Sequence, residues 1–300
     1  MKPIPVLLGP TASGKTALAL EVARNFEVEI VSADAMLVYR GLDIGTAKPT
    51  LAELQAVPHH LIDIVEPEED YDVAQFVQDA ERAILQITAV GKVPLIVGGT
   101  GFYVKALKQG LPLTPRADEE VQQQIWAELE EKGLDHLLGE ISAVNPQEAG
   151  RMQRNPRRVV RALEVFRRTG QFPGEFGYST PKFEYRLFGL SPDLPVLEQR
   201  IARRVERMFE EGLLDEVRQL LVRWSDHPSR RPTALQAIGY KEVLEGMEKG
   251  EDQNTMIQKI TLATRQYAKR QLTWLKTQLQ VECQDAAQMK PELLAYLQDF

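Results

Sequence analysis

Cysteine and long apolar runs are both scarce in this sequence. Its 300 residues include a single cysteine, Cys283. One cysteine rules out an intramolecular disulfide and a zinc site built on paired cysteines, and it fits a reducing compartment. No run approaches the roughly 18 consecutive apolar residues of a membrane span, and Lys2 leads directly into an apolar strand pattern without a cleavable leader. We therefore expect a cytoplasmic protein with no membrane partner.

Histidine is also rare. His59 and His60 are adjacent, whereas His136 and His227 are isolated from each other and from that pair. This spacing matches neither a metal-ligand set nor a serine–histidine pair. We therefore expect structural roles for all four side chains.

The chain carries a formal net charge of −7 at pH 7, which taken alone disfavours a nucleic-acid partner. The basic residues are nevertheless concentrated in two segments. Between 151 and 168 the only acid is Glu164, and between 253 and 281 there is none. The basic residues of these segments are Arg151, Arg154, Arg157, Arg158, Arg161, Arg167, Arg168, Lys259, Arg265, Lys269, Arg270 and Lys276. Charge segregated in this way suits a polyanion that docks on one face.

One segment near the amino end has the pattern of a phosphate-binding loop. The residues Gly9-Pro10-Thr11-Ala12-Ser13-Gly14-Lys15-Thr16 follow an apolar run and open a helical pattern. In such a unit the glycines let backbone N–H groups and a helix N-terminus point at one anion, while the lysine adds charge and the threonine a metal-ligating hydroxyl. A chance match in a turn is the alternative. The motif predicts a bound di- or triphosphate but not its ester, because kinases, GTPases and other transferases share it.

Strand and helix patterns alternate along the first part of the chain. Apolar runs occur at 4–8, 28–32, 61–65 and 93–97, with helical patterns at 17–25, 73–89 and 102–108. This alternation predicts an α/β fold of the P-loop type, in which helices flank a mostly parallel sheet.

The two prolines of the segment 111–115 interrupt both periodicities, and the strand signal then stops. Helical patterns follow at 118–132, 134–141, 147–153 and 156–169, before a strand pattern at 183–190 and helices at 196–211, 213–223, 234–249 and 252–279. We therefore predict a catalytic core of residues 1–113 and 183–300, with an all-helical insertion domain at 114–182.

Polar residues follow two of the predicted strands directly. Asp34 comes after the second strand, and Thr100 lies among the glycines of Gly98-Gly99-Thr100-Gly101 after the fourth. Parallel strands end at the ligand crevice of an open sheet, so we expect Asp34 beside the phosphate loop as a base or metal ligand. A helix N-cap and a tight turn are the respective alternatives. The pattern of the loop 45–49 leaves its role open.

The arginines of the insertion have a helical spacing. Arg154, Arg157, Arg158 and Arg161 are three or four residues apart, which stacks them on one face of a helix. Like charges placed so closely repel, and a phosphate backbone or a diphosphate offsets that repulsion. A solvated amphipathic helix is the alternative.

A second basic face is predicted in the last long helix. Arg265 and Lys269 share a face there, and Tyr267 and Trp274 are interleaved with them. These aromatics serve either as stacking platforms or, more often in helices of this kind, as core residues.

Six motifs in a fixed order carry a resemblance to a known family: GPTASGKT, SADAMLVYRGLDIGTAKP, GGTGFY, NPRRVVRALEVFRRTG, QAIGYKE and TRQYAKRQLTW. Together they span nearly the whole chain and strongly resemble the tRNA dimethylallyltransferases of bacterial type, also called tRNA isopentenyltransferases. The resemblance implies transfer of a five-carbon group from dimethylallyl diphosphate to the exocyclic amine of the adenosine 3′-adjacent to the anticodon. The implied partners are the tRNA anticodon stem-loop and this diphosphate, and we expect a monomer.

The resemblance also implies roles for individual residues. Asp34 matches the family's general base, and Thr100 matches the threonine that bonds the bridging oxygen of the diphosphate or aligns the amine. The diphosphate site then comprises Gly9, Thr11, Ala12, Ser13, Gly14, Lys15 and Thr16, with Mg²⁺ near Thr16. The implied tRNA contacts are Asp34, Ala35, Met36, Leu37, Arg157, Arg158, Arg161, Gln236, Lys241, Arg265 and Lys269.

The chain departs from the family pattern at one point. The family's aspartate-serine-any-glutamine is Asp34-Ala35-Met36-Leu37 here, and Leu37 cannot hydrogen-bond a base edge. Two rival functions remain open from the sequence: a small-molecule or nucleotide kinase built on the same loop, and an RNA-binding regulator that binds tRNA without turnover.

Overall fold

The fold consists of two compact units. The computed structural model describes residues 2–224 and 233–300. One unit comprises Met1–Lys108 with Lys182–Phe300, and the other comprises Gln109–Pro181. The chain thus leaves the first unit and returns to it. The second unit begins five residues before the insertion predicted at 114–182 and ends one residue before its predicted end.

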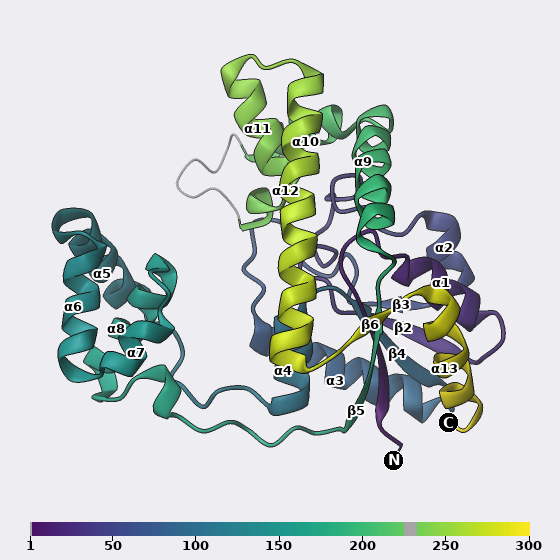
Figure 1. The fold of residues 1–300 in the computed structure, drawn as a ribbon, viewed down its shortest axis with the longest axis horizontal. Helices are drawn as coiled ribbons and strands as arrows, with labels where there is room; N and C mark the ends of the chain where they lie inside the picture. Colours follow the sequence, from purple (N-terminus) through teal and green to yellow (C-terminus); the bar gives the residue numbers. More distant parts are fainter. Residues whose placement is uncertain (1, 225–232) are drawn as a thin grey trace. The chain divides into compact units, whose positions relative to one another are not determined.

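A six-stranded sheet forms the centre of the first unit (Figure 1). Its strands are β1 (Ile4–Leu8), β2 (Val28–Ser32), β3 (His59–His60), β4 (Val93–Gly98), β5 (Tyr185–Leu190) and β6 (Cys283–Gln284), in the order β3-β2-β4-β1-β5-β6. Every pairing is parallel. The predicted α/β fold class is therefore confirmed.

Helices cover the central strands of this sheet, and β1, β2 and β4 are buried along nearly their whole length. Leu7 of β1, Leu95 of β4 and Phe188 of β5 form one apolar cluster with α1 (Lys15–Ala23) and α13 (Ala286–Gln298). The helix α3 (Val73–Ala89) packs on β2 and β4. Phe76 of α3 stacks on Tyr103 of α4 (Gly101–Gln109), with 4.0 Å between their ring centroids.

A second apolar cluster of this unit joins four helices to residues that follow β2. The helices are α9 (Leu194–Glu210), α10 (Leu213–Trp224), α11 (Tyr240–Lys249) and α12 (Gln253–Trp274). The predicted helix at 234–249 is divided, because a 3-10 turn at Thr233–Gln236 is followed by Gly239 with φ of 100°. The helix predicted at 252–279 ends as a π turn at Leu275–Leu279.

The structure differs from the sequence-based predictions at three other places. The strand predicted at 61–65 does not form, since Leu61 and Asp63 have positive φ and their loop bonds the backbone of residues 37 and 38 instead. The helix α2 (Leu51–Ala56) was not predicted, although Thr50 and Glu53 form a capping box at its start. The strand β6 has only two residues and gives no periodic signal.

The second unit is helical around a core of its own. It contains α5 (Glu119–Lys132), α6 (Leu134–Val144), α7 (Pro146–Arg151), α8 (Pro156–Thr169) and a 3-10 turn at Pro173–Glu175. Ile125, Leu137 and Leu163 are completely buried between the helices. Asn155 caps α8 and Gly170 ends it at φ of 76°, so this helix matches its predicted bounds.

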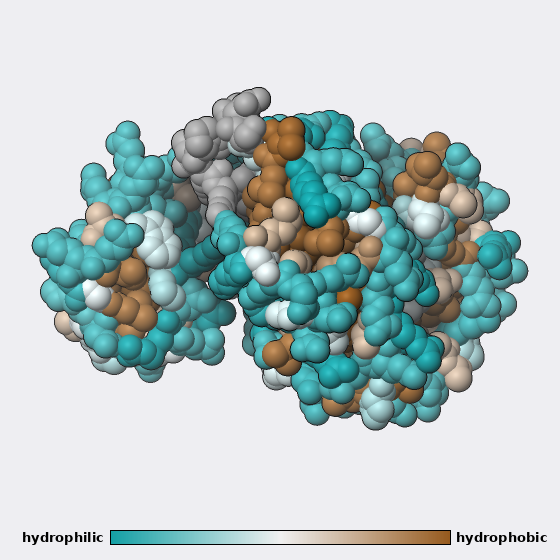
Figure 2. All heavy atoms as spheres, turned by 90° about the horizontal axis from the view of Figure 1, so that it is seen from above, coloured by the Kyte–Doolittle hydropathy of each residue, from teal (hydrophilic) through white to brown (hydrophobic). Residues whose placement is uncertain are grey.

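The face drawn in Figure 2 is mainly hydrophilic, with hydrophobic residues gathered in several groups. Within residues 2–224 and 233–300, no helix combines the length and the apolar character that crossing a bilayer requires.

Candidate functional site

Three loops meet where β1, β4 and β2 end side by side in the sheet. At Gly98 a side chain would place its Cβ 2.1 Å from the carbonyl oxygen of Ala33, and at Gly99 it would lie 3.1 Å from the carbonyl oxygen of Gly9. The backbones therefore touch, and only glycine fits these positions. The amide of Thr100 also donates a 3.2 Å hydrogen bond to the carbonyl oxygen of Ala33. The loops that follow β1, β2 and β4 therefore lie in contact at one edge of the sheet.

The ammonium group of Lys15 is bound by the backbone of its own loop. Lys15 Nζ donates hydrogen bonds to the carbonyl oxygens of Gly9 (3.0 Å) and Pro10 (2.7 Å). Burial lowers the pKa of Lys15 to about 8, while the nearby Asp34 carboxylate opposes this shift and Arg204 adds to it. The loop thus holds an ammonium group that an anion would stabilise.

The other polar groups of the loop also fit a phosphate ester. Ser13 Oγ is buried and has no hydrogen-bond partner within the described residues. Ala12 and Gly14 have positive φ, which curls the loop before α1 begins. Thr16 lies exposed in the first turn of α1. A buried hydroxyl without a partner implies a missing acceptor or donor, which a phosphate oxygen can supply.

The Asp34 carboxylate closes a turn and not a helix. Its Oδ1 accepts a 2.9 Å hydrogen bond from the amide of Met36, and residues 35–38 form turns. The helix N-cap that we weighed as an alternative is therefore wrong, although the carboxylate does order its own backbone. Its second oxygen has no partner in the part of the chain that the structure describes, so it remains available to a ligand. Thr100 Oγ1 accepts a 3.0 Å bond from the amide of Ala35.

Two arginines of α9 lie at the phosphate loop and were not predicted. Arg204 donates from Nη1 to Thr11 Oγ1 (3.2 Å) and from Nη2 to the carbonyl oxygen of Thr46 (2.9 Å). Arg200 Nη1 donates to the carbonyl oxygen of Ser13 at 3.1 Å. Burial lowers the pKa of Arg204, and the Asp34 carboxylate opposes that effect. The four-residue spacing of these arginines on one helix was the available signal.

The side chain of Gln271, on α12, joins two of the loops. Its Oε1 accepts from the amide of Thr11 at 2.8 Å, and its Nε2 donates to the carbonyl oxygen of Gly99 at 2.9 Å. One turn earlier on the same helix, Tyr267 has its pKa raised to about 12 by burial and, next, by Asp34. Trp274 packs against Gly101. Tyr267 and Trp274 are thus half-buried packing residues at the edge of the site.

The arginine face predicted in the insertion is only partly formed. Arg154 precedes α8 and pairs with Asp135 at 2.6 Å, so its placement on one helical face with the others is wrong. Arg161 pairs with the buried carboxylate of Glu164. The repulsion expected among these arginines is therefore largely offset by acids within the unit.

Two exposed arginines of α8 have no acidic partner among the described residues. Arg157 has no partner among the described residues, and Arg158 donates from Nη1 to Gln153 Oε1 at 2.7 Å. These two guanidinium groups are the ones of α8 most available to an anion.

The remaining residues with an expected tRNA contact lie on the first unit. Gln236 and Lys241 are exposed on the 3-10 turn and on α11. On α12, Lys269 is exposed and pairs with Glu198 at 3.2 Å, and the buried Nε of Arg265 lacks a partner within the described residues. The segment Ala35-Met36-Leu37 is partly accessible next to Asp34.

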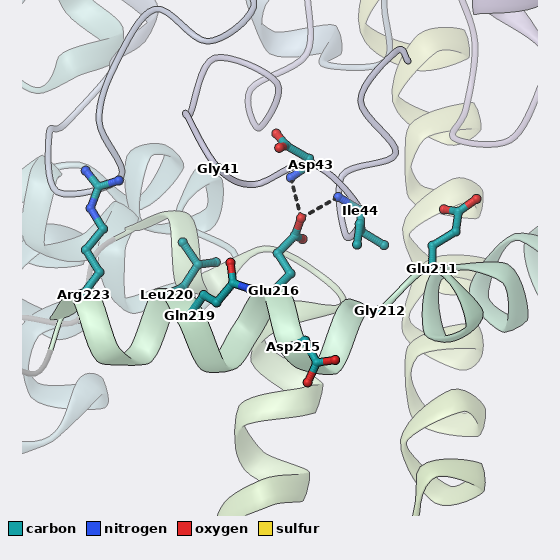
Figure 3. Close-up of a pocket in the computed structure, with 10 residues that line it drawn as sticks. All are labelled: Gly41, Asp43, Ile44, Glu211, Gly212, Asp215, Glu216, Gln219, Leu220 and Arg223. Atoms are coloured by element: carbon teal, nitrogen blue, oxygen red, sulfur yellow. Dashed lines mark hydrogen bonds between the residues drawn. The ribbon is translucent and has the colours of Figure 1, made fainter. Parts of the chain in front are cut away.

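The loop at 45–49 is anchored from α10. The carboxylate of Glu216 accepts hydrogen bonds from the amides of Asp43 (3.0 Å), Ile44 (2.8 Å) and Gly45 (3.1 Å), and Figure 3 shows the first two beside a shallow pocket. Lys48 is buried, with its ammonium between Asp43 and Asp63. These contacts fix the loop, which supplies the Thr46 carbonyl oxygen to Arg204.

The histidines that the structure describes are not gathered into a metal-binding group. His60 bonds Glu29 at 2.7 Å and His59 bonds a backbone carbonyl, while His227 lies outside the described residues. Across residues 2–224 and 233–300 no group of three or more histidine, cysteine, aspartate or glutamate side chains is placed to hold a metal ion.

Comparisons with known proteins agree with this geometry. The family described as IPP transferase matches residues 37–278, and the isopentenyl transferase family matches residues 2–67. The tRNA dimethylallyltransferase of Deinococcus radiodurans is 52% identical over 98% of this chain and 96% of its own length. That of Thermus thermophilus is 50% identical over 92% and 90% of the two chains.

Solved structures give the same result. The tRNA isopentenylpyrophosphate transferase of Bacillus halodurans superposes with a TM-score of 0.70 at 36% identity, covering 100% of this chain and 96% of that one. A eukaryotic dimethylallyltransferase acting on tRNA gives a TM-score of 0.78 at 30% identity, over 95% and 74% of the two chains. With its strand-end loops, its family match and these near full-length relatives, the chain belongs to the tRNA dimethylallyltransferase family of prenyltransferases.

Proposed function

We propose that this protein transfers a dimethylallyl group from dimethylallyl diphosphate to the N6 amine of the adenosine 3′-adjacent to the anticodon of tRNA. The observation that carries the proposal is the meeting of three strand-end loops, which brings Lys15 and Asp34 within electrostatic reach of each other. A cationic anion cradle beside a carboxylate with a free oxygen suits a reaction that expels diphosphate and removes a proton.

The phosphate loop would bind the diphosphate. The amides at the start of α1, the Lys15 ammonium and the unpartnered hydroxyl of Ser13 would contact this one anion, and Arg204 lies at Thr11. These groups stabilise the negative charge that develops on the leaving diphosphate as the carbon–oxygen bond breaks.

Magnesium fits this site as a partner of the diphosphate. Thr16 offers an exposed hydroxyl in the first turn of α1, directly after the phosphate loop. Mg²⁺ retains waters and is typically held by few protein ligands together with substrate phosphates. When bound it would supply further charge stabilisation to the diphosphate.

The loops after β2 and β4 would position the amine nitrogen of the adenosine and accept its proton. The amine nitrogen attacks the allylic carbon, the bond to the bridging oxygen breaks, its electron pair leaves with diphosphate, and the amine proton passes to Asp34. Holding these groups in line is itself a large part of the rate enhancement. Thr100, whose hydroxyl already orders the amide of Ala35, is placed to align the amine or the bridging oxygen.

The tRNA would have to deliver an unstacked base to this site. Extruding a base from the anticodon loop costs a few kcal/mol, which contacts to the RNA backbone offset. Arg157 and Arg158 of the insertion, and Gln236, Lys241, Arg265 and Lys269 of the core, are the side chains that we propose for these contacts. Leu37 makes only apolar contact with a base.

Labelled substrates test the function directly. The protein is incubated with unmodified tRNA and either dimethylallyl diphosphate labelled in its allyl group or ATP labelled in its γ-phosphate. We expect label in the RNA from the diphosphate alone. Phosphate transfer from ATP to a small acceptor would support the kinase, and tRNA binding without any transfer would support the regulator. Sedimentation of the same sample tests the expected monomer.

A further inference from the structure

Gln271 connects segments that are far apart in the sequence. Its side chain is 8% exposed, and it bonds Thr11, 260 residues away, and Gly99, 172 residues away. It enters from α12, which also carries Tyr267 and Lys269. No other side chain in the described residues is recorded with bonds to the backbones of both loops.

The chemistry of this bridge requires an amide. The Thr11 N–H needs an acceptor and the Gly99 carbonyl needs a donor, and a glutamine supplies one of each from a single planar group. The fit is also steric, since a Cβ at Gly99 would lie 2.5 Å from Gln271 Nε2. A methionine could fill the same volume but would leave both backbone groups buried and unpaired.

From this geometry we infer that Gln271 is a positioning residue for the transfer, an inference that rests on the proposed function. It sets the separation between the loop that would hold the diphosphate and the loop that carries Thr100. Because those loops would hold the two reacting molecules, the bridge fixes the approach of the amine to the allylic carbon. A displacement of about 1 Å in such an alignment can cost about 100-fold in rate.

The first test compares Gln271→Met with the wild type and with Gln288→Met, a control on α13 whose exposed side chain has no recorded hydrogen bond. We expect kcat of Gln271→Met to fall roughly 10- to 100-fold, with KM for both substrates within about threefold and the control unchanged. A kcat within twofold of the wild type, or a rise in KM at constant kcat, would overturn the inference.

A second variant keeps the test decisive if Gln271→Met folds poorly. In Gln271→Glu the introduced carboxyl, when protonated, both donates and accepts as the amide does, and when ionised it only accepts. The ratio of its kcat to that of the wild type should therefore rise as the pH falls. Taking this ratio at each pH cancels every ionisation that the two proteins share. A pH-independent ratio would contradict the inference.

These outcomes are separable from failure of the proposed function. If the wild type transfers no label to tRNA, the proposed function fails whatever the variants do. If the wild type transfers label and both Gln271 variants match it at every pH, only the positioning role fails.

Discussion

The pKa of Lys15 gives the binding site a pH dependence that can be worked out in advance. Burial places the pKa of this ammonium at about 8 in the free protein, against an ordinary value of 10.5. Dimethylallyl diphosphate binds the protonated form, and its negative charge should raise the pKa of Lys15 in the complex. The affinity is therefore full below pH 8 and falls as the pH rises through that value.

The size of the effect follows from the protonated fraction. At pH 7 about nine-tenths of the free protein carries the charge, and at pH 9 about one-tenth does, so the apparent Kd should rise about tenfold between these values. The ligand contributes little to this change, because the last ionisation of a phosphate ester lies near pH 6. Isothermal titration calorimetry at fixed Mg²⁺ and ionic strength measures the two constants.

The variant Lys15→Met provides the control. It removes the titrating group, so its Kd should be much higher than that of the wild type at pH 7 and nearly independent of pH up to 9. A wild-type Kd that is the same at both values would refute the assignment of the depressed pKa to the anion site. A tenfold change in Kd that persists in Lys15→Met would show that another group causes the pH dependence.

Three further predictions concern other side chains. Asp34→Asn retains an acceptor for the amide of Met36 but removes the base. Its kcat should fall by about 100-fold or more, while its tRNA affinity in a filter-binding assay stays nearly unchanged. An equal loss of tRNA affinity would indicate a structural role. Arg204→Ala removes the bond to Thr11 and should raise the Kd for the diphosphate about tenfold or more, while tRNA affinity stays constant; an unchanged calorimetric Kd would contradict this. Arg157→Ala and Arg158→Ala should each reduce the slope of log K for tRNA binding against log salt concentration by about one. Arg167→Ala is the control and should leave this slope unchanged, because the Arg167 guanidinium pairs with Glu128 and Glu140. Equal slopes in all three variants would count against the proposed contact.

Local signals account for what the sequence could predict. The phosphate loop, Asp34 and Thr100 each follow directly on a contiguous buried strand, so their placement at one edge follows from parallel strand order alone. The helix α8 was bounded correctly because Asn155-Pro156 and Gly170 are strong start and stop signals. The apolar run at 61–65 predicts a strand, but Leu61 and Asp63 adopt left-handed backbone conformations that a strand does not allow.

The contacts that the sequence could not predict join residues that are far apart along the chain. Arg204 meets Thr11 across 193 residues, and Gln271 meets Gly99 across 172 residues, so no local pattern records either pair. The arginines of the insertion show the converse difficulty. Their spacing indicates a shared charged face, but Asp135 of α6 pairs with Arg154, and Glu164, three residues further along α8, pairs with Arg161.

The most direct measurement is a crystal structure of the protein with an anticodon stem-loop and an unreactive thio analogue of dimethylallyl diphosphate. It should show the diphosphate on the amides of the phosphate loop, with Lys15 and Arg204 beside it, and the adenosine N6 about 3 Å from the free oxygen of Asp34. An adenosine bound elsewhere, with the Asp34 carboxylate turned away from its amine, would contradict the account.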